Sequence, residues 1–311
     1  MISIGIIGVG IVGEKVIKQL QDEKHVEIKT VYDEHTERLT EISQRYQLPI
    51  ASSIEEVMHS DINWLYIATP PAHHAEIADL AASAGINILC EKPLAHDVEA
   101  GEMMAKSAQN NRVQTAMHFP LMYKPAVREM AKRIKTGAIG KVVRIELQTF
   151  FPDWPRPWQQ NPWIASRSQG GFVREVFPHY LQLMNRLFGD LNFLSHQITY
   201  PEESDKCETG IIAHGRTEQH IPFLITGISN IGQSELLQFT VYGEQGVLTL
   251  ENWTDLYEST THEARQLIQG FEAVPTLFDE MNEPSPVLVD FEEGLIIQRH
   301  IDQLLTAQVK G

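Results

Sequence analysis

Apolar residues in the first 118 positions fall into short, nearly continuous runs, separated by segments in which they recur every three or four residues. Continuous runs of this length predict buried strands, and the wider spacing predicts helices with one buried face. The predicted strands cover residues 2–7, 26–32, 64–68, 86–90 and 113–117, with a short strand at 49–50. Since helical segments separate the strands, the pattern predicts a doubly wound parallel sheet with helices on both faces.

Beyond residue 140 the apolar residues alternate with polar ones, a period of two that is typical of half-buried strands. The pattern is clearest over 143–151 and returns at 237–241, after which Gly243–Gly246 turns the chain back into 247–250. Further strands are expected at 191–199, 208–213 and 221–230, and helices at 123–136 and 286–308. The sequence therefore predicts an α/β domain over residues 1–119 and an α+β domain with a mostly antiparallel sheet over 120–311.

The first predicted strand leads into Gly8-Val9-Gly10-Ile11-Val12-Gly13, which fits the pattern G-x-G-x-x-G and precedes a predicted helix. In dinucleotide-binding folds the first glycine permits a tight turn and the second lets the pyrophosphate approach the backbone. The third lets the helix pack closely on the strand. The start of the helix then offers N–H groups to the phosphates. The cofactor-binding candidates in this loop are Gly8, Gly10, Ile11, Val12 and Gly13.

Asp33 ends the second predicted strand. A carboxylate at this place can accept hydrogen bonds from the adenosine ribose and would repel a 2′-phosphate. The sequence therefore favours NAD over NADP. Arg38, the first cation after Asp33, leaves NADP possible because its side chain is long enough to turn toward a phosphate.

Ligands bind at the carboxyl ends of the strands in sheets of this type, so the loops there are candidates for the site. Thr69 and Pro70 follow the strand at 64–68, and Glu91-Lys92-Pro93 follows the strand at 86–90. Lys92 is either a side chain aimed at a ligand or a solvated loop lysine. The remaining cofactor-binding candidates are Asp33, Thr69, Pro70, His74, Glu91 and Lys92. His74, at the start of a helix, is more simply explained as a surface histidine.

The composition narrows the classes of partner. The chain of 311 residues has 25 Lys and Arg against 41 Asp and Glu, a net charge of −16, which argues against nucleic acid or an anionic membrane. No apolar run reaches the ~18–20 residues of a membrane helix, and the chain begins directly with a strand, so no signal peptide is expected. The two cysteines lack C-x-x-C spacing, which fits a reducing compartment. We expect a cytoplasmic protein with a small-molecule substrate.

The second domain contains one candidate for acid–base chemistry. Gly170-Gly171 leads to Glu175, and Pro178-His179 begins a helix with Leu181, Met184 and Leu187 on its buried side. At the start of a helix the dipole favours the neutral imidazole, which suits a general base. A hydrogen-bonded core histidine is the alternative. Glu175 and His179 could also bind a metal, but no further ligand has matching spacing, so we expect none.

Residues 150–163 combine aromatic residues with four prolines, which prevent a regular helix. The segment is either an aromatic wall over a small substrate or a packed connection.

Several motifs together resemble the Gfo/Idh/MocA oxidoreductases, the relatives of glucose–fructose oxidoreductase and inositol dehydrogenase. The resemblance extends over nearly the whole chain. It is carried by the glycine motif, Thr69-Pro70-Pro71, Glu91-Lys92-Pro93, Gly137–Val142, Gly170–His179 and Tyr242–Gly246. Two positions depart from the family pattern, because Glu175 stands where an aspartate is usual and Met122 where an arginine is frequent.

The resemblance implies a Rossmann domain followed by a domain with one open sheet. It also implies NAD(P)-dependent hydride transfer to or from a sugar, cyclitol or related polyol. In relatives, the residues that match Lys92 and His179 act at the substrate, and Glu175 would orient one of them. An open sheet leaves one face uncovered, which predicts a homodimer or homotetramer joined through that sheet. Two other functions remain: an NAD-dependent glycosidase that oxidises and eliminates, and a non-catalytic NAD-binding regulator.

Overall fold

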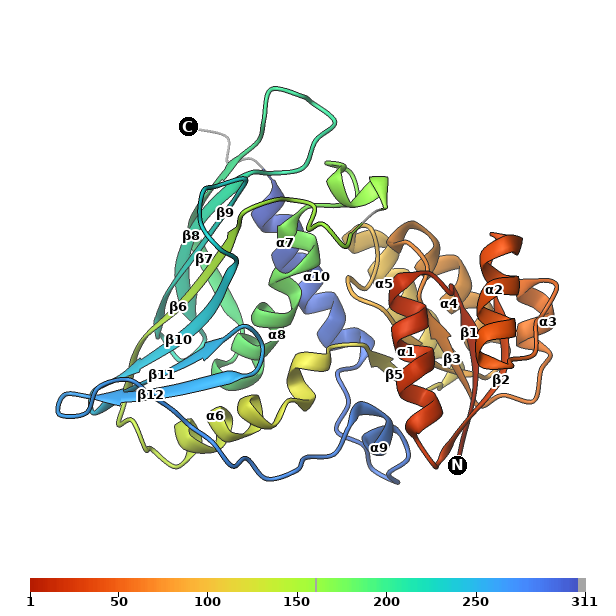
Figure 1. Cartoon of the computed structure of the whole chain (residues 1–311), viewed down its shortest axis with the longest axis horizontal. Helices are drawn as coiled ribbons and strands as arrows, with labels where there is room; N and C mark the ends of the chain where they lie inside the picture. The colour runs from red at the N-terminus through yellow and green to blue at the C-terminus, as the bar shows by residue number, and fades with distance from the viewer. Residues whose placement is uncertain (160, 307–311) are drawn as a thin grey trace. The chain divides into compact units, whose positions relative to one another are not determined.

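The computed structural model describes residues 1–159 and 161–306. The chain divides into two compact units (Figure 1). The first unit contains Met1–Phe119 and Pro275–Gln298, and the second contains Pro120–Val274 and the chain from Arg299 onward. The sequence placed 275–298 in the second domain, and the contacts given below explain why this segment belongs to the first unit. Among the described residues, no helix is long and apolar enough to cross a membrane.

The first unit is built on a five-stranded parallel sheet in the order β2-β1-β3-β4-β5. The strands are β1 (Ile2–Ile7), β2 (Val26–Tyr32), β3 (Trp64–Ile67), β4 (Asn87–Cys90) and β5 (Thr115–Met117). The helices between them are α1 (Ile11–Asp22), α2 (Thr36–Tyr46), α3 (Ile54–Met58), α4 (His74–Ser83) and α5 (Val98–Asn111). The short strand predicted at 49–50 is a single bridge between Val31 and Ile50. The strand order reverses between β1 and β3, the place where such sheets bind ligands.

The segment Pro275–Gln298 adds α9 (Leu277–Met281) and the first part of α10 (Phe291–Leu305) to this unit. It is held to the end of the sheet, because Met117 N donates to Val289 O at 2.7 Å and Phe291 N donates to Thr115 Oγ1 at 3.1 Å. The helix begins at Phe291 and not at 286, since the Asp290 side chain accepts from Glu293 N at 2.9 Å and caps the first turn there. The predicted residues 307–308 lie outside the described residues.

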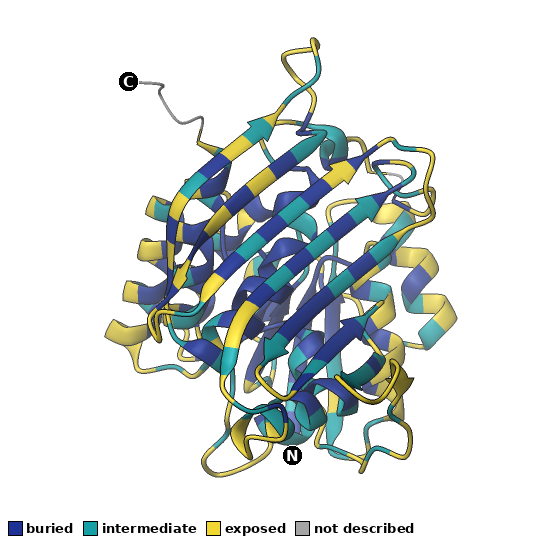
Figure 2. Ribbon diagram, turned by 90° about the vertical axis from the view of Figure 1, so that its left-hand side faces the viewer, coloured by how far each residue is buried: buried dark blue, intermediate teal, exposed yellow. Residues whose placement is uncertain are grey.

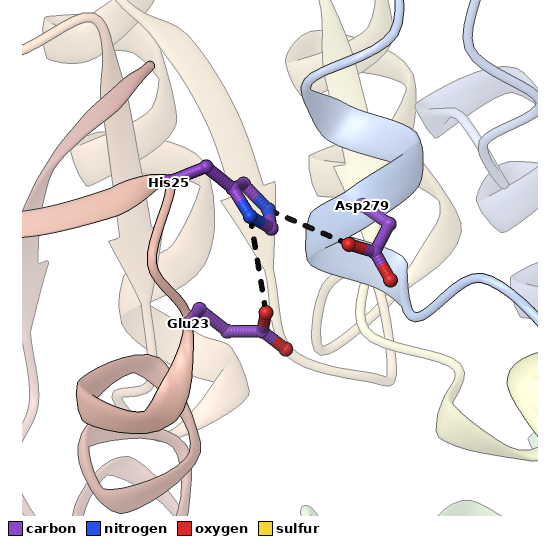
Figure 3. Close-up of side chains that lie close together, drawn as sticks. All are labelled: Glu23, His25 and Asp279. Carbon is purple, nitrogen blue, oxygen red and sulfur yellow. Dashed lines mark ion pairs between the residues drawn. The ribbon is translucent and has the colours of Figure 1, made fainter.

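Ion pairs tie α9 to the turn that precedes β2. His25 Nδ1 lies 3.9 Å from Glu23 Oε2, and His25 Nε2 lies 3.8 Å from Asp279 Oδ1 (Figure 3). Although these three residues are close enough to hold a cation, the two carboxylates face opposite ring nitrogens. His25 Nε2 also lies 3.0 Å from Phe278 O, a partner that requires a proton on that nitrogen. We therefore interpret the cluster as a structural contact.

The second unit is built on an eight-stranded sheet in the order β13-β12-β11-β10-β6-β9-β8-β7. Its strands are β6 (Val142–Phe151), β7 (Leu191–Thr199), β8 (Gly210–Thr217), β9 (Pro222–Ser229), β10 (Leu236–Gly243), β11 (Gly246–Glu251), β12 (Asp255–Thr260) and β13 (Gln266–Leu267). All neighbours are antiparallel except β6 and β9. Buried and exposed positions alternate along the strands, as Figure 2 shows, which is why the period of two was visible in the sequence.

The helices α6 (Pro125–Lys135), α7 (Phe172–Glu175) and α8 (Phe177–Phe188) belong to the same unit. Tyr180 of α8 packs against Phe239 of β10, and a Cβ on Gly227 of β9 would lie 2.6 Å from the Phe172 ring. One face of the sheet is therefore covered by helices of its own unit. The strands β12 and β13 were not predicted, because β12 has only one fully buried apolar position, Leu256.

Candidate active site

The glycine loop between β1 and α1 has three glycines with different surroundings. Gly8 has φ +98°, and a Cβ on it would lie 2.5 Å from the carbonyl oxygen of Ala68. A Cβ on Gly13 would overlap the carbonyl oxygen of Gly8. In contrast, a Cβ on the exposed Gly10 would meet nothing within 4 Å. The protein's own packing therefore requires glycine at the two ends of the motif, whereas the middle glycine leaves open space for a group from outside, as a dinucleotide cradle needs.

The start of α1 is available to an anion. Its N-cap residue is Gly10, which offers no side chain to cap the first N–H groups. Ile11 is half-buried, and Val12 is 41% exposed. The loop therefore presents both backbone donors and an apolar surface.

Asp33, directly after β2, is bonded to the glycine loop. Its Oδ2 accepts from Val9 N at 2.8 Å, and its Oδ1 accepts from His35 N at 2.9 Å. The carboxylate is thus fixed beside the loop at the position expected for a ribose contact.

Arg38 is held in a network of carboxylates. Its Nε donates to Val9 O at 3.1 Å, and its guanidinium pairs with Glu14 at 2.5 Å and with Glu41 at 2.8 Å. Arg45 also pairs with Glu14 and Glu41. Burial alone would raise the pKa of Glu14, but the bonds from Arg38, Tyr46 and Arg45 outweigh it and lower that pKa. The charge of Arg38 is therefore already compensated within the protein.

His74 is fully buried, so the expectation of a surface histidine was wrong. Its Nε2 lies 2.9 Å from Thr69 O, and its Nδ1 lies 3.1 Å from Leu94 O and 3.4 Å from Cys90 Sγ. Burial lowers the pKa of His74, which favours the neutral ring with a single N–H. A neutral ring can donate to only one of the two carbonyl oxygens, so His74 lies between the loops after β3 and β4 and its N–H bonds to one of them.

Thr69 contains a polar atom that a ligand could satisfy. Its Oγ1 is buried and has no hydrogen-bond partner in the described part of the chain. Pro70, which follows it, is half-buried and precedes a short 3₁₀ helix over Pro71–His73. A buried hydroxyl at the carboxyl end of β3 fits a site for a polar cofactor.

Glu91 anchors the loop that carries Lys92. Its Oε1 accepts from Tyr66 OH and from His118 Nδ1, each at 2.5 Å, and the residue is 8% exposed. Burial alone would raise the pKa of Glu91, but the pairing with His118 and the bond from Tyr66 lower it. Both hydrogen bonds of Glu91 Oε1 are therefore made to residues of the same unit. The neighbouring Lys92 is half-buried. The contacts of Tyr66 and His118 with Glu91 were not expected from the sequence. Tyr66 lies inside an apolar run, where it resembles an ordinary core residue.

In the second unit, Glu175 and His179 lie on separate helical segments. Glu175 is the last residue of α7, and the chain turns at Val176 before α8 begins. His179, in the first turn of α8, is 6% exposed. This agrees with the expectation that Glu175 lies in the turn that enters the helix of His179.

Trp253 is an aromatic neighbour of His179 that was not expected from the sequence. Its ring is nearly perpendicular to the His179 imidazole, at 82°, with the ring centroids 4.9 Å apart. Trp253 lies in the turn between β11 and β12. No signal pointed to it, because β12 was not recognised.

Glu208 is hydrogen-bonded to the start of α7. Its Oε1 accepts from Val173 N at 2.7 Å, and the carboxylate is 1% exposed. Gly171 has φ +98°, and a Cβ there would overlap this carboxylate, so glycine is required at that position. Burial raises the pKa of Glu208 to about 7, although the bond from Val173 N and the charge of Arg174 oppose the shift. No pattern in the sequence indicates that this acid is buried.

The aromatic segment after β6 is a packed connection in its first part. Phe151, Trp154 and Phe172 pack together, with ring centroids 4.9 to 5.9 Å apart. The Arg156 guanidinium lies 4.9 Å above the Phe151 ring and binds Glu235 through two hydrogen bonds. Trp158 is 49% exposed, and residue 160 lies outside the described residues.

Two family models match the chain. Residues 2–119 match the NAD-binding Rossmann fold of the GFO_IDH_MocA oxidoreductase family, and residues 127–249 match the GFO/IDH/MocA C-terminal domain. The chain belongs to the Gfo/Idh/MocA family. Its first unit is an NAD-binding Rossmann domain, and the fold class expected from the sequence is confirmed.

Curated relatives include a levoglucosan dehydrogenase from Pseudarthrobacter phenanthrenivorans, 33% identical over 42% of this chain and 34% of that protein. The scyllo-inositol 2-dehydrogenase (NADP(+)) of Bacillus subtilis is 30% identical over 45% of this chain and 44% of the relative. The chain thus aligns with less than half the length of both. A solved levoglucosan dehydrogenase in complex with NADH shares the fold, with a TM-score of 0.84, 19% identity, and coverage of 98% of this chain and 96% of that one.

The first prediction concerns the buried acid. The pKa of Glu208 is raised in the folded protein, so its stabilising contribution is complete below about pH 4.5 and is lost as the pH rises through 7. Glu208→Gln removes this titration. Between pH 5 and 8 the wild type should lose about 2–3 kcal/mol of unfolding free energy relative to the variant. Urea unfolding of both proteins at pH 5 and at pH 8 measures the change. If the difference in unfolding free energy between wild type and variant is the same at both pH values, the raised pKa of Glu208 is contradicted.

Proposed function

We propose that this protein is an NAD(P)-dependent dehydrogenase or reductase. It acts on a hydroxyl or carbonyl group of a small substrate, a sugar, a cyclitol or a related polyol. The observation that carries the proposal is the glycine loop, in which only the middle glycine leaves room for an outside group. The relatives that are named as dehydrogenases of levoglucosan and scyllo-inositol support the substrate class.

In this proposal the residues that hold the dinucleotide are the backbone of Gly8–Gly13, Asp33 and the loops that begin at Thr69 and Glu91. The nicotinamide supplies the hydride chemistry when it is bound. His179 takes the proton from the substrate hydroxyl in oxidation and returns it in reduction. The Lys92 ammonium donates a hydrogen bond to the same oxygen and stabilises its negative charge. Glu175 orients one of these groups.

Steady-state absorbance of reduced nicotinamide, measured with NAD or NADP and a panel of polyols, tests the activity itself. A chromogenic glycoside assay in parallel tests the NAD-dependent glycosidase, which would show no net turnover of the cofactor. Cofactor binding without activity in either assay would instead favour a regulator.

The second prediction separates the roles of two glycines. Gly10→Ala places a methyl group in open space, so the variant should fold normally but lose at least about tenfold in NAD affinity, because the methyl group occupies the path of the pyrophosphate. Calorimetric titration measures the affinity and thermal unfolding measures the fold. Gly13→Ala is the matched control: its methyl group overlaps Gly8 O, so it should lower the melting temperature as well. Unchanged NAD affinity in Gly10→Ala would exclude this loop as the pyrophosphate site.

The third prediction concerns cofactor preference. Asp33 is fixed beside the loop and Arg38 is compensated by Glu14 and Glu41, so NAD should bind at least about tenfold more tightly than NADP. Asp33→Asn keeps an acceptor for Val9 N but removes the charge, and it should narrow this difference. Glu27→Gln, which removes a carboxylate from the same part of the chain, should not. An equal or higher affinity of the wild type for NADP would refute the preference.

The fourth prediction concerns the catalytic pair. Lys92→Met retains the stem of the side chain without its charge, and His179→Asn retains a polar group without the base. Each should lower turnover by ~10²–10⁴-fold, with a smaller combined loss than the product of the two if both groups act on one oxygen. NAD affinity should change little in His179→Asn. Lys18→Met makes the same change as Lys92→Met on the exposed side of α1, and as the control it should leave turnover unchanged. Near wild-type turnover in either single variant would remove that residue from the mechanism.

The proposed assembly is a homodimer or homotetramer formed through the uncovered face of the second-unit sheet. Leu236, Phe150 and Ile228 lie opposite one another on three neighbouring strands of this face. Ile228 is 42% exposed, and Ile212 on the next strand is 57% exposed. Adjacent exposed apolar side chains on an otherwise regular sheet are typical of a surface that is buried in an assembly.

The fifth prediction tests this assembly. Light scattering coupled to gel filtration should give at least twice the mass of one chain for the wild type. Ile228→Lys should shift the equilibrium toward the monomer, because the ammonium would be buried without a partner. Met103→Lys, a change at an exposed apolar position in the first unit, should leave the mass unchanged. A monomeric wild type would contradict the assembly.

A further inference from the structure

Trp253 has a backbone conformation that its side chain does not favour. It has φ +74°, directly after Asn252 with φ +46°, in the turn that joins β11 to β12. Asparagine and glycine are the usual residues in such turns, whereas a bulky residue with positive φ costs conformational free energy. Strain of this kind persists only where the surrounding structure enforces it, and it is concentrated at functional sites.

The surrounding structure does enforce it. Asn252 N donates to Leu237 O at 2.9 Å, and Leu237 N donates to Asn252 Oδ1 at 3.3 Å, so the residue before Trp253 is bonded twice to β10. The Trp253 ring also packs on the Tyr180 ring, with centroids 5.4 Å apart and an angle of 35°. Tyr180 is fully buried and packs in turn on Phe239. The indole is therefore rigidly supported from the core of the second unit.

The indole contacts the His179 imidazole, with the ring centroids 4.9 Å apart and the ring planes at 82°. Trp253 is only half-buried, so part of this residue is accessible to a ligand. The neighbourhood thus combines a rigid aromatic surface with a group that can exchange a proton with a hydroxyl. A sugar or cyclitol ring has the matching surfaces: C–H groups on one face and hydroxyl groups on its rim.

We propose that Trp253 is a specificity-determining residue, whose indole packs against the C–H face of a cyclic polyol while one hydroxyl of that ring reaches His179. This inference rests on the proposed function and narrows its substrate class from polyols in general to rings. An open-chain polyol cannot present a continuous C–H face without being ordered first, which costs conformational entropy. Trp253 therefore discriminates cyclic from acyclic substrates mainly through binding.

The test compares Trp253→Leu and Trp253→Phe with the wild type. The substrates are rings (D-glucose, myo-inositol, levoglucosan) and chains (D-sorbitol, D-mannitol), each with a saturating cofactor. Trp253→Leu should lower kcat/KM for the rings by about tenfold or more, mostly through KM, and should leave kcat/KM for the chains within about threefold. Trp253→Phe, which keeps an aromatic face, should retain most of the preference. NAD affinity should stay unchanged in both variants.

Tyr257→Leu is the matched control. Tyr257 lies on β12 of the same hairpin, but its ring contacts the Arg265 guanidinium at 3.8 Å and not His179. This variant should keep the preference for rings. If Trp253→Leu fails to fold, the difference in fluorescence between the wild type and Trp253→Phe reports Trp253 directly, and a bound ring substrate should change that difference.

The outcomes separate the two proposals. If the wild type turns over none of these polyols with either cofactor, the proposed function is overturned, and this inference with it. If the wild type is active and Trp253→Leu keeps the same ratio of ring to chain kcat/KM, only the inference is overturned. Unchanged Trp253 fluorescence on binding of a substrate ring would also overturn the inference alone.

Discussion

The close approach of backbone to backbone at the carboxyl end of β1 is the constraint on which the first unit depends. The Gly8 turn lies against Ala68 at the end of β3, and Gly13 of α1 lies directly on the Gly8 carbonyl. No side chain fits at either contact, so helix, turn and two strands are fixed relative to one another by main-chain atoms. A Cβ on Gly10, between these contacts, would meet nothing within 4 Å, so the loop presents an open backbone surface there. The same loop positions Asp33, because Val9 N donates to its carboxylate.

Buried carboxylates play a similar part elsewhere in the protein. Glu91 accepts hydrogen bonds from Tyr66 and His118 in the loop that carries Lys92. Glu208 accepts from Val173 N in the first turn of α7. Glu91 directly precedes Lys92, and Glu208 accepts from Val173 N at the start of the helix that ends at Glu175, so each acid bonds to groups of its own unit. A carboxyl oxygen that is buried away from competing water makes strong and directional hydrogen bonds. These acids therefore help to fix the conformation of the segments that carry Lys92 and Glu175, the two half-buried residues to which the proposed function assigns roles at the substrate.

The sequence was sufficient for features that repeat along the chain. The boundaries of β1 and β2 agree to the residue, because their apolar runs end at Gly8 and at Asp33, and the alternation over β6 and β10 identified the second sheet. Features that depend on contacts between distant residues were missed. Tyr66 resembled an ordinary core residue, and nothing in the sequence marked its bond to Glu91. The burial of His74 also depends on loops that come together only in the fold. Trp253 could not be placed, because its turn is recognisable only once β12 is known.

The central claim is that the protein transfers a hydride between a nicotinamide and a carbon atom of its substrate. The most direct measurement uses a ring polyol with deuterium on the reacting carbon, NAD, and mass spectrometry of the reduced cofactor. The account predicts that the deuterium appears in the reduced nicotinamide, and that His179→Asn makes this transfer much slower while the cofactor still binds. A protein that binds NAD, converts the polyol and leaves no deuterium on the nicotinamide would contradict the account.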